Sequence, residues 1–413
     1  MSNSNFIQYS DLSLSVTKEL TKKEKKDYGI FITPKVIIEK LINAVIKIAN
    51  DNNIIIKDIL EPSCGTCEFV NYFDNIMNNI KIDAVEYNFN IFKRLKNLKF
   101  INDVNLINNN FIKFDNNINY SLIIGNPPYF VCKKEDVPIE YKQYIIGRPN
   151  IFGLFILHSL SLLKNNGLLA FIVPKSFLNS IYYSNIRNFI KKTCEIMDII
   201  DFESDNEFID TDQSTFGLIL KKNNTNNDNP HDCKFSMNIN GDFIFTTNYD
   251  ELKSLFEGST TLIKLGLKVR TGNIVWNEHK EKLTNDVSET LLIYNTNITK
   301  NNELEIKSFK NDEKKQYIKL DGRIDTIMVV NRGNGNSKYK LNYTIIDKKI
   351  YLIENHLNEI YASSSITKDE LLNMFNKISQ SFKNPKTQKF IDLFLGNNGL
   401  SKTELETIFP IYL

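Results

Sequence analysis

Short apolar segments alternate with amphipathic helical segments between residues 54 and 220. The apolar run at residues 54–60 is rich in β-branched side chains, which is typical of a strand buried in a sheet. Strands separated by helices lie parallel, because a parallel pair needs a crossover connection. The last segments, around Phe208 and at residues 215–220, follow each other through a turn and predict an antiparallel end. The pattern predicts an α/β, doubly wound domain.

The composition changes after the last of these strands. A polar, asparagine-rich stretch at residues 223–231 contains a proline near its end and predicts a linker. A chain of 413 residues is too long for one ordinary core, so two domains are expected. Residues 232–413 lack the alternation and predict a mixed α+β second domain. Residues 1–27 are polar and predict a mobile or helical arm, which leaves residues 28–222 as the first domain.

Cysteine and histidine usage argues against a metal site. Cys64 and Cys67 form a C-x-x-C pair, but no second pair follows, and the four histidines are not at ligand spacing. Five sparse cysteines fit reduced thiols, which predicts a cytoplasmic protein. No apolar run reaches roughly 18 residues, so no membrane span is expected. The net charge is only +2, so a nucleic acid would have to be held by a local basic patch.

The strand predicted at residues 120–124 runs into the sequence Asn126-Pro127-Pro128-Tyr129. Neither proline has a backbone N–H, and both restrict the backbone, so a rigid shelf is expected at the end of this strand. The Asn126 side-chain oxygen and the Pro127 carbonyl can accept the two hydrogens of an exocyclic amino group. Tyr129 offers a face on which a planar ring can stack. An ordinary proline turn is the alternative interpretation.

A small-residue loop follows the first strand and leads into a helix, where doubly wound folds bind ligands. It contains one glycine, so the dinucleotide-binding fingerprint is absent, but its backbone N–H groups can approach a polar ligand. Glu86 ends the next strand, where a carboxylate can accept both hydroxyls of a ribose. A solvated acid at a strand end is the alternative for Glu86. The loop residues are Glu61, Pro62, Ser63, Cys64 and Gly65.

Thr33 and Pro34 precede an apolar pattern of helical spacing that extends to Ala49. A threonine oxygen can cap the first free N–H groups of a helix, and proline suits the first helical position. We therefore expect Thr33 to be a helix cap. A contact between Thr33 and a ligand does not follow from that role.

In their order along the chain, these motifs resemble the gamma-class, TaqI-type DNA N6-adenine methyltransferases of restriction–modification systems. The resemblance covers most of the chain and includes a C-terminal target-recognition domain. Cys67 stands where many relatives have a second glycine, and Asn110 stands where an aspartate usually holds the cofactor's adenine. An asparagine oxygen can still accept that hydrogen bond, without charge assistance. The matching segments are residues 29–34, the loop at 61–65, Glu86, Asn110 with Phe111, the catalytic motif at 126–129, and residues 150–155 and 167–178.

The resemblance implies a Rossmann-like catalytic domain that binds S-adenosyl-L-methionine. It also implies a target adenine that is flipped out of the duplex, held by Asn126 and Pro127, and stacked on Tyr129. Phe208 matches the position of a second aromatic wall, with Phe216 in reserve, and core packing is the alternative for both. The residues expected to contact the cofactor are Thr33, Glu61, Pro62, Ser63, Cys64, Gly65, Glu86, Asn110, Phe111 and Pro128.

Basic residues in the second domain are candidates for DNA contact. They surround a glycine-broken loop at residues 331–336 and a second loop near residue 270, from which arginine can read base edges. Solvated surface charges are the alternative. Double-stranded DNA is the expected partner, a cognate restriction endonuclease is compatible with the resemblance, and a monomer is expected. The candidates are Arg270, Arg323, Arg332, Lys338 and Lys340.

Two other functions remain open from the sequence. The Asn-Pro-Pro-Tyr motif also occurs in enzymes that methylate a glutamine amide in translation release factors, and in some ribosomal RNA methyltransferases. The long second domain argues against a release-factor enzyme, which would not need one. A non-catalytic DNA-binding specificity protein is a third possibility. The intact motif at Asn126 argues against it, whereas Asn110 gives it slight support.

Overall fold

The computed structural model divides into two compact units, Met1–Thr247 and Asn248–Leu413. Phe208 and Lys338 lie outside the described part of the chain, so their predicted roles are not addressed by it. Among the described residues, no helix is long and apolar enough to span a bilayer. The described residues are 9–21, 23–25, 29, 31–116, 118–202, 214–333, 339–362, 366–395 and 399–413.

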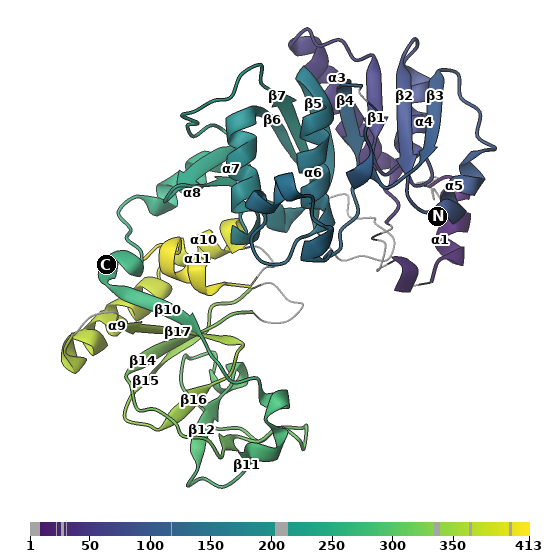
Figure 1. Cartoon of the computed structure of the whole chain (residues 1–413). Coiled ribbons are helices and arrows are strands. Elements are labelled where there is room, and N and C mark those ends of the chain that lie inside the picture. The colour runs from purple at the N-terminus through teal and green to yellow at the C-terminus, as the bar shows by residue number, and fades with distance from the viewer. Residues whose placement is uncertain are drawn as a thin grey trace, which may run out of the picture. The chain divides into compact units, whose positions relative to one another are not determined.

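A seven-stranded sheet forms the centre of the first unit (Figure 1). Its order is β3-β2-β1-β4-β5-β7-β6. Strands β1 to β5 pair in parallel, whereas β7 runs antiparallel to both β5 and β6, which confirms the predicted doubly wound sheet with an antiparallel end. The strands are β1 (Asp58–Glu61), β2 (Lys81–Glu86), β3 (Asp103–Asn108), β4 (Tyr120–Gly125), β5 (Leu163–Pro174), β6 (Cys194–Asp201) and β7 (Thr215–Lys222).

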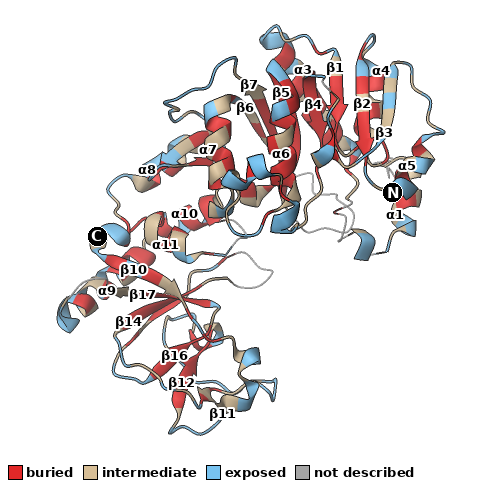
Figure 2. Ribbon diagram, in the orientation of Figure 1, coloured by how far each residue is buried: buried red, intermediate tan, exposed pale blue. Residues whose placement is uncertain are grey.

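Helices cover both faces of this sheet. Leu122 and Ile124 of β4 pack in one apolar core with α3 and α4, and the intervening Ile123 packs in the other core with α6 and α7. This alternation follows from the period of two in a strand, and both faces are buried because parallel sheets are covered on both sides (Figure 2). The helices are α1 (Asp11–Glu19), α3 (Lys35–Asp51), α4 (Glu68–Ile76), α5 (Phe89–Leu95), α6 (Ile151–Leu162) and α7 (Ser184–Thr193).

The strand order places a topological switch point between β1 and β4. These two strands are neighbours in the sheet although two other strands lie between them in the sequence. Chains that leave the carboxyl ends of such a pair diverge to opposite faces and open a crevice for ligands. Glu61 ends β1, Glu86 ends β2 and Gly125 ends β4, so all three strand ends carry residues of the predicted motifs to one edge of the sheet.

The boundary between the units lies later than the linker predicted at residues 223–231. After that stretch the chain forms the hairpin of β8 (Ser236–Ile239) and β9 (Asp242–Phe245), which packs on α7. Buried Arg187 of α7 donates from Nε to the Phe243 carbonyl at 2.6 Å. The hairpin therefore belongs to the first unit, and the polar stretch is a surface loop within it, because its polarity reports exposure and not a domain boundary.

The second unit is a mixed α+β structure, as predicted. One of its sheets has the order β10-β17-β14-β15 and the other β11-β13-β12-β16. The strands are β10 (Leu267–Thr271), β11 (Leu283–Thr284), β12 (Thr290–Ile293), β13 (Tyr317–Ile318), β14 (Ile327–Asn331), β15 (Tyr343–Ile346), β16 (Tyr351–Ile353) and β17 (Leu357–Ala362). The helices are α8 (Tyr249–Phe256), α9 (Lys368–Phe382), α10 (Pro385–Phe390) and α11 (Lys402–Thr407).

Candidate active site

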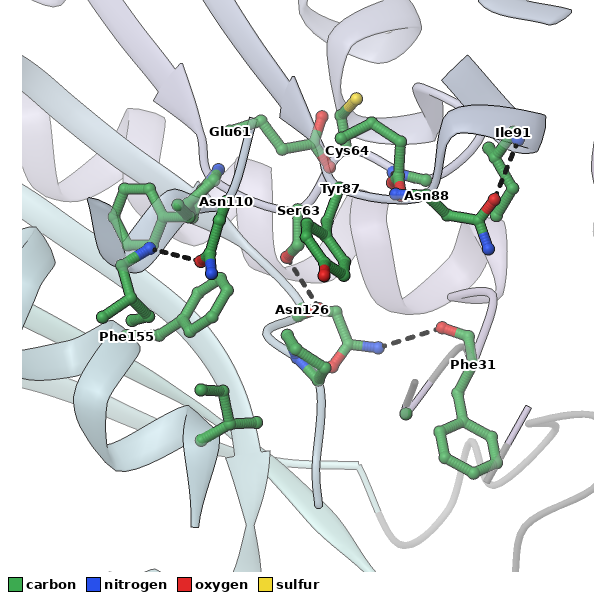
Figure 3. Close-up of a pocket in the computed structure, with 18 of the residues that line it drawn as sticks. Phe31, Glu61, Ser63, Cys64, Tyr87, Asn88, Ile91, Asn110, Asn126 and Phe155 are labelled. Carbon is green, nitrogen blue, oxygen red and sulfur yellow. Dashed lines mark hydrogen bonds between the residues drawn. The ribbon is translucent and has the colours of Figure 1, made fainter. Parts of the chain in front are cut away.

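A cavity of about 580 Å³ lies at the carboxyl ends of β1, β2 and β4 (Figure 3). It gathers segments that are far apart in the sequence, as expected when parallel strands end at one edge. Pro127 and Tyr129 of the shelf are not among the residues that line it. The predicted residues that line it are Thr33, Glu61, Pro62, Ser63, Cys64, Gly65, Glu86, Asn110, Phe111, Asn126 and Pro128.

The loop after β1 is fixed by its backbone. Cys64 donates its N–H to the Val85 carbonyl at 2.9 Å, and Gly65 donates its N–H to Glu86 Oε2 at 2.9 Å. Cys67, which replaces a glycine expected from the resemblance, has φ of +65°. A side chain in this left-handed region costs about 1–2 kcal/mol, which explains why glycine is suited to the position. The buried Cys67 side chain occupies the apolar core beside α4.

Glu86 is buried and holds the loop at the same time. Its Oε2 accepts from Gly65, and its Oε1 accepts from the Asn88 N–H at 2.6 Å. Burial raises the pKa of Glu86 to about 7, although the backbone N–H groups act in the opposite direction. Each carboxylate oxygen has a second lone pair, so Glu86 can accept further hydrogen bonds from hydroxyl groups in the cavity.

Glu61 is only 3% exposed, and its Oε2 has no hydrogen-bond partner among the described residues. Burial raises the pKa of Glu61 well above its usual value. A buried carboxyl oxygen without a partner is costly unless a ligand satisfies it. Because Glu61 lines the cavity, a cationic or hydrogen-bond-donating group of a ligand would supply the missing partner.

Asn110 uses its oxygen to begin a short helical turn. Oδ1 accepts from the Ile112 N–H at 3.0 Å and caps the 3₁₀ helix Phe111–Lys113. The other end of the amide is an NH₂ group, which can only donate. Phe111 is buried, and its ring centroid lies 4.8 Å from that of Phe155, so most of this side chain belongs to the core under the cavity.

The amide of Asn126 is held at both ends. Nδ2 donates to Thr33 Oγ1 at 3.1 Å and to the Phe31 carbonyl at 3.4 Å, while Oδ1 accepts from the Tyr129 hydroxyl at 2.5 Å. The Ser63 hydroxyl donates to the main-chain carbonyl of Asn126 at 3.2 Å and joins the shelf to the loop after β1. These contacts converge at the cavity wall, and the bonds from Asn126 to Phe31 and from Ser63 can be followed in Figure 3.

Tyr129, the last residue of the shelf, is half-buried. Its hydroxyl also lies 2.8 Å from the Ile172 carbonyl, and its ring meets Phe152 edge-on with centroids 5.9 Å apart. Burial raises the pKa of Tyr129 well above its usual value, so the phenol remains a hydrogen-bond donor. Phe216, the reserve candidate for an aromatic wall, is 1% exposed within β7 and packs in the core, as its alternative interpretation stated.

Thr33 is not the helix cap that the sequence suggested. Helix α3 begins at Lys35, its N-cap residue is Pro34, and no side chain caps it. The helix therefore starts one residue late, and this shift leaves the Thr33 hydroxyl for Asn126.

Gly29 and the N-terminal helix were not recognised as site residues from the sequence. A Cβ atom on Gly29, whose φ is +61°, would stand 2.8 Å from the Tyr129 nitrogen and 2.9 Å from Pro128 Cβ. Gly29 thus lets the N-terminal segment pass directly against the shelf. The one available signal was its place at the start of residues 29–34, a segment that matches the family.

Helix α1 contacts two walls of the cavity. Its buried Ser13 hydroxyl lies 2.6 Å from Thr66 Oγ1 and also donates to Glu68, and both partners line the cavity. Arg94 of α5 donates to Glu19 at 2.6 Å and forms an ion pair with it. The polar composition of this segment concealed these contacts, because its partners are distant in the sequence.

In the second unit, two of the predicted DNA-contacting arginines are paired with one acid. Arg270 Nε lies 3.0 Å from Glu359 Oε2, and Arg323 donates to the same oxygen. Glu359 is 1% exposed, so this cluster is part of the fold. Arg332 donates to the Asn355 carbonyl at 2.9 Å, whereas Lys340 is exposed. Arg270 lies within β10 and pairs with Glu359 of β17, so the loop predicted near residue 270 is wrong at this position. The structural partners of these arginines come from distant segments, which the sequence did not reveal.

Two known proteins are similar in sequence to nearly the whole chain. A family model, the Eco57I restriction-modification methylase, matches residues 5–208. The chain is 26% identical over 409 residues to the type II methyltransferase M.CvrRI of Paramecium bursaria Chlorella virus XZ-6E, covering 98% of this chain and 99% of that protein. It is 27% identical to the modification methylase CviBIII of Paramecium bursaria Chlorella virus NC1A, covering 99% and 100%.

Among solved structures, one is described as a class I S-adenosylmethionine-dependent methyltransferase from Listeria monocytogenes. Its TM-score is 0.42 at 18% identity, and the match covers 54% of this chain and 68% of that one. The family match lies within the first unit, whereas the two viral relatives align with both units.

Proposed function

We propose that this chain, as a type II restriction-modification DNA methyltransferase, modifies adenine. It methylates the N6 amino group of an adenine that is flipped out of duplex DNA. The observation that carries the proposal is the placement of the Asn126 amide at the wall of a cavity that also contains Glu61 and Glu86. One cavity thus combines the Asn126 amide, an acceptor for an amino group, with acidic groups suited to S-adenosyl-L-methionine.

The donors and acceptors of the cavity fit S-adenosyl-L-methionine, the cofactor of these enzymes. The unpartnered Oε2 of Glu61 can accept from the ammonium group of the methionine part. Glu86 can accept from the ribose hydroxyls through its remaining lone pairs. Ile91 and Phe155 line the same cavity and offer apolar surface to the adenine ring. When bound, the cofactor supplies a methyl group that is electrophilic because it is carried by a sulfonium ion.

The shelf supplies the positioning that this transfer needs. The lone pair of an aromatic amine is delocalised into the ring, so the amine is a poor nucleophile. Asn126 Oδ1 and the Pro127 carbonyl accept its two hydrogens and favour the geometry in which the lone pair projects toward the methyl donor. No side chain is required to remove a proton beforehand, since the nitrogen becomes acidic as the methyl group is transferred. Tyr129 offers one face to the flipped base, and such stacking contributes about 1–3 kcal/mol.

The order of the motifs supports the gamma-class assignment. The cofactor loop follows β1, the catalytic shelf follows β4, and the second unit comes last. We propose that this second unit recognises the target sequence, because the two viral relatives align across it. Arg332 and exposed Lys340 are the basic candidates that remain outside the ion-pair cluster on Glu359. We also propose that the protein is a cytoplasmic monomer and that it accompanies a cognate restriction endonuclease.

Transfer of a radiolabelled methyl group from S-adenosyl-L-methionine tests the reaction. Unmethylated duplex DNA, ribosomal RNA and a release factor are offered separately to the wild-type protein and to Asn126→Ala. We expect label on DNA alone, and a loss of label in the variant. Asn75→Ala, on the exposed surface of α4, is the matched control and should transfer normally. Label on RNA or on the release factor would identify that molecule, in place of DNA, as the substrate. Sequence-specific DNA binding without any transfer would support a non-catalytic specificity protein.

A further inference from the structure

The two ends of the Asn126 amide are nearly equal in size but opposite in hydrogen bonding. Its oxygen accepts, whereas its NH₂ group donates. An amide turned by 180° would direct two donors at the hydrogens of the target amine and could not hold them. The reaction proposed above therefore depends on which way this amide points, and the structure contains a group that decides it.

We propose that Thr33, assisted by the Phe31 carbonyl, is a positioning residue that keeps the Asn126 oxygen directed at the target amine. This assignment rests on the proposed methyl transfer. Nδ2 lies 3.1 Å from Thr33 Oγ1 and 3.4 Å from the Phe31 carbonyl. A carbonyl can only accept, so this side of the amide must be the NH₂ group. In the reversed amide, Oδ1 would face the Phe31 oxygen and repel it.

The burial and partners of Thr33 suit this role. The residue is 6% exposed, and Asn126 is the partner of its side chain within the described part of the chain. Because α3 begins at Lys35 with Pro34 as its N-cap, the Thr33 hydroxyl is not needed by the helix. A buried hydroxyl that accepts from the NH₂ group also retains its own proton, which it can donate toward the cavity that it lines.

The other end of the amide is held by a contact that can be exchanged. The Tyr129 hydroxyl lies 2.5 Å from Asn126 Oδ1 and 2.8 Å from the Ile172 carbonyl, but it has only one proton for these two acceptors. When a target amine arrives at Oδ1, Tyr129 can donate to Ile172 without losing a hydrogen bond. The tyrosine then no longer specifies the amide orientation. Thr33 and Phe31 remain to hold it while the target is bound.

Two variants separate the hydroxyl from the shape of the side chain. Thr33→Val keeps the size and the β-branching but removes the acceptor, and Thr33→Ser keeps the acceptor. Thr193→Val is the matched control, because its hydroxyl bonds, among the residues that the structure describes, only to Phe189 in the last turn of α7 and to neighbouring Cys194. Thermal unfolding of all three variants would show that they remain folded.

Three quantities are measured for each protein. They are the Kd of S-adenosyl-L-methionine by calorimetry, base flipping by 2-aminopurine fluorescence, and the single-turnover rate of methyl transfer at saturating cofactor. For Thr33→Val we expect Kd and flipping within about twofold of wild type, and a rate lower by roughly tenfold to a hundredfold, since small misplacements of reacting groups have such effects. Thr33→Ser should restore most of the rate, and Thr193→Val should leave it unchanged.

The assignment is overturned if Thr33→Val transfers at the wild-type rate, or if saturating cofactor removes its defect. In the second case Thr33 acts on cofactor binding, as the resemblance implied. Equal loss in Thr33→Ser would also overturn it, because the hydroxyl would then not be the important group. These outcomes leave an active wild-type protein and thus spare the proposed function. A wild-type protein that methylates nothing refutes the proposed function and this assignment together.

Discussion

Replacing Asn110 by aspartate should strengthen cofactor binding. In the structure, Asn110 Oδ1 accepts from the Ile112 N–H at 3.0 Å, and the NH₂ end of the amide is left at the cavity. An NH₂ group cannot accept a hydrogen bond from the amino group of the cofactor's adenine. An aspartate would keep the cap with one oxygen and offer the other as a charged acceptor. The variant thus adds an interaction that the wild-type side chain is poorly placed to make.

The size of the effect follows from the type of hydrogen bond. A net hydrogen bond contributes about 0.5–1.5 kcal/mol between neutral groups and about 1.5–3 kcal/mol when one group is charged. Asn110 is only half-buried, so solvent screens the new charge, and we expect a gain of about 1 kcal/mol. This corresponds to a Kd lower by roughly fivefold.

Calorimetric titration of S-adenosyl-L-methionine measures this change directly. Asn109→Asp is the matched control, because it adds the same charge at the neighbouring, exposed position. The reasoning would be refuted if Asn110→Asp bound the cofactor no more tightly than Asn109→Asp. Weaker binding in Asn110→Asp would show that the Asn110 amide donates to the cofactor through its NH₂ group.

Four further predictions concern Gly29, Glu86 and Ser13. Gly29→Ala would force a methyl group to within 2.8 Å of the Tyr129 nitrogen, so the transfer rate should fall by roughly tenfold or more while melting, followed by calorimetry, stays cooperative. Burial raises the pKa of Glu86 to about 7, and its ionised form accepts ribose hydroxyls better, so cofactor affinity should rise as pH increases through 7. Glu86→Gln should reduce that dependence in titrations, and Glu61, whose pKa is also raised, accounts for any dependence that persists. The same raised pKa means that the folded state binds the proton of Glu86 more tightly than the unfolded state does. The contribution of Glu86 to the free energy of unfolding should therefore decline as the pH rises from 4.5 to about 7. Denaturant titrations of the wild-type protein and Glu86→Gln would detect this change. Ser13→Ala removes the bonds of the Ser13 hydroxyl to Thr66 and Glu68 but leaves the bond from the N-cap Ser10 to Glu68. The Kd of the cofactor should therefore increase by roughly threefold to tenfold without a change in the rate at saturation. An unchanged Kd would mean that Ser13 does not support the cavity loop.

The sheet and the main motifs were predictable because they depend on local pattern. In β4, Ile123 packs in the core on one face of the sheet and Leu122 in the core on the other, which follows from the strand period. Glu61 and Glu86 line the same cavity because parallel strands end at one edge of the sheet, which is a general property of the fold. Their convergence at the cavity therefore required no knowledge of side-chain packing.

Other features depend on contacts between distant segments and could not be derived in this way. The bond between Asn126 and Thr33 joins residues 93 positions apart. The ion pairs of Arg270 and Arg323 depend on Glu359, which nothing in the sequence marks as buried. The unit boundary was misplaced because the polar stretch resembles a linker, while the following hairpin returns to α7.

The most direct test of the account is the identity of the methylated nucleoside. Duplex DNA treated with the protein and labelled S-adenosyl-L-methionine is digested to nucleosides, which are separated by chromatography and identified by mass spectrometry. The account predicts label in N6-methyldeoxyadenosine for the wild-type protein and none for Asn126→Ala. Label in N4-methyldeoxycytidine would contradict the adenine assignment, and undiminished label in Asn126→Ala would contradict the role of the shelf.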